Sequence, residues 1–173
     1  MKYLLAACAG AAAMASAPLA AQEVFGGLYN HDVETPLVKS GNIEDGVDVM
    51  VGWRGGRIGA TPIQPYVYGA LNSAGDTSFA AAGLSAKFGG WLYIRPGLGI
   101  AIHSGSASNF ENPFNQRVEF GSRIVFAPEL GIGVQFSSRA SAELSIVHLS
   151  HGQLLGRQNP GLDSVGARVN FAF

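Results

Sequence analysis

The sequence predicts an all-β protein, an eight-stranded antiparallel β-barrel of the outer-membrane type. Three observations favour this class over a soluble sandwich or barrel. Apolar residues alternate with small or polar ones along eight segments. Several segments reach 11 or more residues, which is long enough for a tilted membrane-spanning strand. The chain also ends on an aromatic strand, Phe171-Ala172-Phe173.

The composition agrees with strands in an apolar environment. Charged residues make up 13% of the chain, against about 25% in an ordinary soluble domain. Glycine accounts for 24 of 173 residues, about twice its usual share. The formal net charge of −1 gives no electrostatic basis for binding nucleic acid. The length indicates one domain.

The first residues have the pattern of a signal peptide. Lys2 supplies a positive start, and an uncharged, alanine-rich stretch with small residues follows as far as Ala21. We therefore expect a signal peptide over residues 1–21 and a transmembrane β-barrel domain over residues 22–173; a membrane anchor is the alternative. The single cysteine, Cys8, lies in the leader, so the exported domain would have no disulfide.

The expected strands follow in order, separated by turn-rich pieces. They are residues 23–29, 46–54, 63–72, 77–88, 91–104, 122–137, 140–150 and 163–173. No stretch after the leader approaches 18 uncharged apolar residues, so no transmembrane helix is expected. A terminal phenylalanine, as in Phe173, resembles the signal by which outer-membrane barrels are recognised for assembly.

The two faces of these strands differ. In residues 124–136, large apolar side chains alternate with glycine, alanine and polar residues. An outer-membrane barrel turns the apolar face to lipid and the other face to its lumen. The charged residues of the second face would then share the lumen, where opposite charges could pair; they are Asp48, Arg54, Lys87, Arg95, Glu129, Glu143 and Arg168. Four aromatic residues near strand ends are candidates for interface girdles: Tyr29, Trp53, Trp91 and Tyr93.

The last hairpin carries the residues that indicate chemistry. His148 and Ser150 are two apart, so on a strand they share a face, and Asp163 begins the next strand. With both termini on the periplasmic side, residues 140–150 run outward, which brings these three residues near the outer leaflet. Their positions continue the lipid-facing alternation. Polar groups on such a face are costly unless they partner one another.

A hydroxyl, an imidazole and a carboxylate in this order favour ester hydrolysis or acyl transfer. Ser150 would be the nucleophile, His148 the general base and then acid, and Asp163 the group that orients the imidazole. Asn159, or a backbone N–H within Ser150-His151-Gly152, could stabilise the oxyanion.

Three other interpretations of the hairpin stay open. His148 could belong to a polar loop rim with no catalytic role. Ser164 could be the nucleophile, although its alternation points inward. A metal site of His148, His151 and Asp163 is disfavoured, because two histidines three apart on a strand face opposite sides.

The hairpin resembles that of the lipid A 3-O-deacylases of the outer membrane (PagL type). The resembling residues are His148-Leu149-Ser150 and Asn159-Pro160-Gly161-Leu162-Asp163-Ser164. The resemblance implies an eight-stranded barrel with a Ser-His-acid triad on its outer wall, formed here by Ser150, His148 and Asp163. Two positions depart from the family pattern: His151 replaces an asparagine linked to the oxyanion, and Asp163 is one carbon shorter than the usual glutamate.

The expected function is therefore that of an outer-membrane esterase acting on the ester-linked 3-hydroxyacyl chain at position 3 of lipid A. Its expected partners are lipopolysaccharide and the surrounding outer-membrane lipid, and a homodimer stays open. We expect no metal, no cofactor and no nucleic acid. The alternative is a non-catalytic small barrel with a structural or adhesive role, and a small channel is a third hypothesis.

Overall fold

The computed structural model describes residues 22–38, 41–108, 116–152, 154 and 160–173. The expected signal peptide over residues 1–21 lies outside this part, and so does Asn159. The strands are β1 (Glu23–Asn30), β2 (Val47–Arg54), β3 (Ile63–Asn72), β4 (Phe79–Ala86), β5 (Phe88–Gly89), β6 (Leu92–His103), β7 (Ile124–Gln135), β8 (Ala140–Leu149) and β9 (Leu162–Ala172). Within the described residues, no helix is long and apolar enough to cross a membrane.

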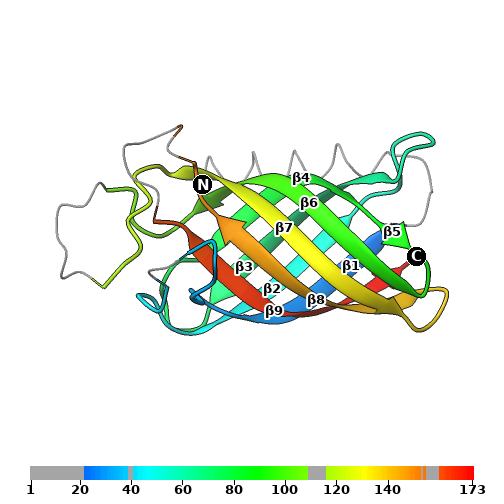
Figure 1. Cartoon of the computed structure of the whole chain (residues 1–173), viewed down its shortest axis with the longest axis horizontal. Coiled ribbons are helices and arrows are strands. Elements are labelled where there is room, and N and C mark those ends of the chain that lie inside the picture. Colours follow the sequence, from blue (N-terminus) through cyan, green and yellow to red (C-terminus); the bar gives the residue numbers. More distant parts are fainter. Residues whose placement is uncertain (1–21, 39–40, 109–115, 153, 155–159) are drawn as a thin grey trace, which may run out of the picture.

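These strands form a closed antiparallel barrel, which has eight strands when β4 and β5 are counted as one (Figure 1). Strand β1 pairs with β9, and the additional pairing of β4 with β6 closes the sheet. The short β5 keeps the register of β4 against β6, since Ser85 faces Gly97 and Phe88 faces Ile94. We therefore treat β4 and β5 as one strand. Pro96 lies on β6 opposite the interruption and has no N–H to donate there. The predicted fold class is confirmed.

The alternation predicted for the strands is present. Along β7, Leu130 and Ile132 are exposed, whereas Gly131 and Gly133, which alternate with them, are buried. The same alternation gives β2, β6, β8 and β9 an apolar outer face and a small or polar inner face. An apolar outer face is what a barrel in lipid requires.

The interior contains a continuous chain of alternating charges. Arg54 contacts Glu23 at 2.6 Å, and Glu23 contacts Arg95 at 3.2 Å. Arg95 lies 2.8 Å from Glu143, which lies 2.6 Å from Arg168. Arg168 in turn pairs with Glu129 at 3.0 Å. Five of the seven predicted lumen charges therefore pair with one another or with Glu23, which the alternation did not single out. Asp48 instead contacts His31, and Lys87 contacts the uncharged Gln135.

Two of the expected girdle aromatics are lumen residues instead. Tyr29 is 1% exposed and its hydroxyl is 2.6 Å from Ser145 Oγ. Tyr93 is 2% exposed and donates to Ser141 Oγ at 2.8 Å. Their places in the alternation, and not their closeness to strand ends, decide which way they point. Trp91 is 73% exposed, as a girdle residue should be.

The two ends of the barrel differ. One end, which we call the turn end, holds the start of β1, the end of β9 and the short connections, such as residues 136–139. The opposite end, the loop end, holds the described parts of the long connections, such as residues 31–38, 41–46, 104–108 and 116–123 (Figure 1). Glu44 joins three loop-end segments, because its carboxylate contacts His31, Thr77 and the Val118 N–H. Hydrogen bonds to Glu44 therefore tie these three segments of the loop end together.

Candidate active site

His148 and Asp163 meet at the loop end of the β8–β9 hairpin. The two residues face each other directly in the register. His148 Nδ1 lies 2.5 Å from Asp163 Oδ1. The His148 side chain is 15% exposed and that of Asp163 is fully buried. His148 follows the outward-facing Leu144 and Ile146 in alternation, and Asp163 precedes the outward-facing Val165.

This contact fixes the roles of the two ring nitrogens. An ionised carboxylate only accepts hydrogen bonds, so Nδ1–H of His148 donates to Asp163. The neutral imidazole then has its lone pair on Nε2. A histidine in this state is oriented by its carboxylate and can accept a proton at Nε2.

Backbone hydrogen bonds hold Ser150, two residues after His148, in an extended conformation. Its N–H donates to the Phe126 carbonyl at 3.1 Å, and its own carbonyl accepts from the Phe126 N–H at 2.7 Å. The chain is thus still extended two residues after His148, which brings both side chains to the same face. Among the described residues, no hydrogen bond joins the Ser150 hydroxyl to the imidazole. Contacts of this kind often tighten only when substrate binds.

Thr35 completes the surroundings of Asp163. Its hydroxyl donates to Asp163 Oδ2 and accepts the Leu37 N–H at 3.0 Å. The backbone supports the same contact, since the Val33 N–H donates to the Asp163 carbonyl at 2.8 Å. Sequence reasoning missed Thr35, because it precedes Asp163 by 128 positions and no short motif includes it.

The other predicted residues fall elsewhere. His151 is fully buried, and its Nε2–H donates to the Phe120 carbonyl at 2.6 Å. In the described part of the chain, no group of three potential ligands is arranged to hold a metal ion. Ser164 is buried and donates to Asp48 Oδ2 at 2.7 Å. Gly152 takes a positive φ of 57° just after the strand, and Asn159 lies outside the described residues.

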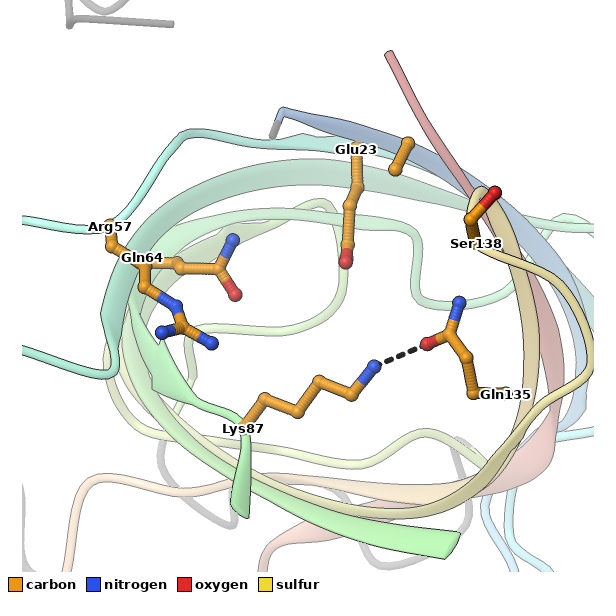
Figure 2. A pocket seen from close by; sticks show the side chains of 7 residues that line it. Glu23, Arg57, Gln64, Lys87, Gln135 and Ser138 are labelled. Carbon is orange, nitrogen blue, oxygen red and sulfur yellow. Dashed lines mark hydrogen bonds between the residues drawn. The ribbon is translucent and has the colours of Figure 1, made fainter. Parts of the chain in front are cut away.

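A separate polar hollow lies at the turn end. Its volume is about 310 Å³, and its lining includes Glu23, Arg57, Gln64, Lys87, Gln135 and Ser138. Figure 2 shows these side chains around the opening, with Lys87 bonded to Gln135. His148 and Asp163 stand at the loop end, so this hollow and the candidate site lie at opposite ends of the barrel.

An apolar outer wall, a lumen filled with paired charges and long loops at one end define a class, the small outer-membrane β-barrels. The family described as lipid A 3-O-deacylase (PagL) matches residues 47–172. This match covers more than half of the chain, and the chain therefore belongs to that family. The family and the fold assign the chain to the outer membrane. A comparison with curated proteins finds no match.

Solved structures agree on the architecture. The crystal structure of the outer membrane enzyme PagL is 16% identical, with a TM-score of 0.59 over 86% of this chain and 98% of that chain. A de novo designed transmembrane β-barrel is 10% identical, with a TM-score of 0.57 over 91% and 98%. Neisserial surface protein A is 14% identical, with a TM-score of 0.52 over 88% and 97%. Because a designed barrel fits as well as an enzyme, these likenesses concern the fold.

Proposed function

We propose that this chain hydrolyses the ester-linked 3-hydroxyacyl chain at position 3 of lipid A, with Ser150, His148 and Asp163 as its catalytic residues. The observation that carries the proposal is the contact of 2.5 Å between His148 Nδ1 and Asp163 Oδ1. This contact joins two residues that occupy outward-facing positions in the alternation of β8 and β9. The barrel that carries them belongs to the lipid A 3-O-deacylase family. With the termini on the periplasmic side, the loop end faces the outer leaflet, where lipid A could reach the pair from the side.

The reaction follows from the roles of the three side chains. Ser150 Oγ attacks the ester carbonyl carbon while its proton passes to His148 Nε2. The bond from that carbon to the sugar oxygen then breaks, and His148 returns the proton to the departing oxygen. Water attacks the acyl-Ser150 ester with His148 again taking a proton, which finally restores the serine hydroxyl as the fatty acid leaves. Asp163 stabilises the imidazolium that forms in both halves.

The oxyanion needs donors that are not already used. The Ser150 N–H is bonded to the Phe126 carbonyl, so it is committed to the strand. The His151 imidazole is bonded inside the barrel and does not reach the outer face. We therefore assign oxyanion stabilisation to the backbone N–H of Gly152 and to Asn159.

The first test is mass spectrometry of lipid A from cells that express the chain. We expect the native chain to remove one 3-hydroxyacyl group, and Ser150→Ala to reduce the rate by several orders of magnitude with the barrel intact. Ser138→Ala is the matched control, since Ser138 is exposed at the turn end. Ser164→Ala tests the alternative nucleophile and should retain activity, because Ser164 is buried against Asp48.

Two results would contradict the proposal. An unchanged lipid A spectrum from correctly inserted native barrel would favour the alternative, a non-catalytic barrel with a structural or adhesive role. Equal activity of the native chain and Ser150→Ala would show that another group is the nucleophile.

A further inference from the structure

The carboxylate of Asp163 is bonded through both of its oxygens. Oδ1 accepts from His148 Nδ1, and Oδ2 accepts from the Thr35 hydroxyl. Two donors on different oxygens fix the rotation of the carboxylate about its own bond. Among the described residues, the donor to Oδ1 comes from β8 and the donor to Oδ2 from the β1–β2 loop (residues 31–46).

The Thr35 hydroxyl has only one arrangement that satisfies its neighbours. It accepts the Leu37 N–H at 3.0 Å, so its single proton is available to Asp163. The Thr35 N–H donates to the Val38 carbonyl at 3.0 Å, which closes a tight turn around the hydroxyl. Thr35 is thus oriented by its own backbone before it meets the carboxylate.

The loop that carries Thr35 is itself anchored. The Val33 N–H donates to the Asp163 carbonyl, two residues before Thr35. The start of the loop is also bonded to its end, because Asp32 Oδ2 accepts the N–H groups of Ile43 and Glu44 at 2.8 and 3.0 Å. A donor in a loop that is anchored at these two points can orient a carboxylate without first losing much conformational freedom.

From these contacts we propose that Thr35 is a positioning residue for the deacylation, holding the Asp163 carboxylate at the angle that His148 needs. This inference rests on the proposed function. A hydroxyl behind the carboxylate fixes its second oxygen, so Asp163 can serve His148 from its position on β9.

The test compares Thr35→Val, Thr35→Ser and the native chain as purified full-length barrel with lipid A in detergent micelles. Valine keeps the shape of threonine and removes the hydroxyl, so we expect kcat to fall about 10- to 100-fold as the imidazole loses its fixed orientation. KM should stay within about twofold, because Thr35 contacts Asp163 and not the substrate. Serine retains the hydroxyl and should restore kcat to near the native value.

Two further variants separate positioning from a general effect on the loop. Glu34→Gln changes the exposed neighbouring side chain and should leave kcat unchanged. In an Asp163→Asn background, Thr35→Val should cause little further loss, because the carboxylate that it positions is gone. Heat-dependent migration in gel electrophoresis confirms that each variant is a folded barrel.

The outcomes are distinguishable. Full kcat in Thr35→Val, or an equal loss in Thr35→Ser, would overturn the positioning role while Ser150-dependent activity still supported the deacylase. A native chain without deacylase activity would instead overturn the proposed function itself.

Discussion

At the scale of single residues, the absence of a side chain at Gly161 leaves room for the His148 imidazole. Gly161 has a positive φ of 70°, and a Cβ there would lie 3.0 Å from both His148 Cε1 and Val38 Cγ2. We expect Gly161→Ala to displace His148 and to lower kcat about 10-fold or more. The measurement is the deacylation rate of the folded variant.

Gly59 supplies a matched control for this substitution. It has a similar φ of 58°, but a Cβ there meets nothing within 4 Å. Gly59→Ala therefore carries the cost of the left-handed backbone, about 1–2 kcal/mol, without a collision. If both variants lost the same activity, backbone strain and not contact with His148 would be the cause.

At the scale of elements, His31 anchors the β1–β2 loop inside the barrel. Its Nδ1 lies 2.9 Å from Asp48 Oδ1 and its Nε2 lies 3.0 Å from Glu44 Oε2. Burial alone would lower the pKa of His31, but the hydrogen bonds that the imidazolium donates to the two carboxylates outweigh it and raise the pKa to about 9. Burial would likewise raise the pKa of Glu44, yet the bonds from His31 and Thr77 hold it below its usual range.

The sign of the pH effect follows from this raised pKa. The loop receives its full stabilisation below the ordinary histidine value of about 6.5. That stabilisation declines as the pH rises toward about 9, because the folded state keeps a proton that the unfolded state has lost. Hydrogen exchange at the amides of Ile43 and Glu44, corrected for the intrinsic rate, should therefore show less protection at pH 9.5 than at pH 6. In His31→Gln this difference should disappear, and its persistence would assign the effect to another group.

The strands and loops also show which features of the fold and the site could be predicted from the sequence. The eight strands, their inner and outer faces and five of the six members of the lumen charge chain could be predicted, because alternation is a local property of each strand. The approach of His148 to Asp163 could also be predicted, since both stand at the end of one hairpin. Thr35 could not be, because its contact depends on how a loop folds back over a distant strand.

At the scale of the whole molecule, the buried charges link most of the barrel wall. The chain from Arg54 to Glu129 draws its members from β1, β2, β6, β7, β8 and β9. Each internal member has two opposite charges as neighbours, so removing one leaves buried charge without compensation. Arg168 is the member that joins Glu143 to Glu129.

We therefore expect Arg168→Met to destabilise the barrel by about 3–5 kcal/mol, because two buried carboxylates lose their common partner. Reversible urea unfolding in lipid vesicles measures this loss. Arg139→Met, at an exposed turn-end position, is the control and should change stability by less than about 0.5 kcal/mol.

The folded fraction of Arg168→Met should keep its kcat, since the charge chain lies inside the wall and the proposed site outside it. Native stability in Arg168→Met would show that the carboxylates find other partners, and a lost kcat in folded protein would show that the lumen and the site are coupled.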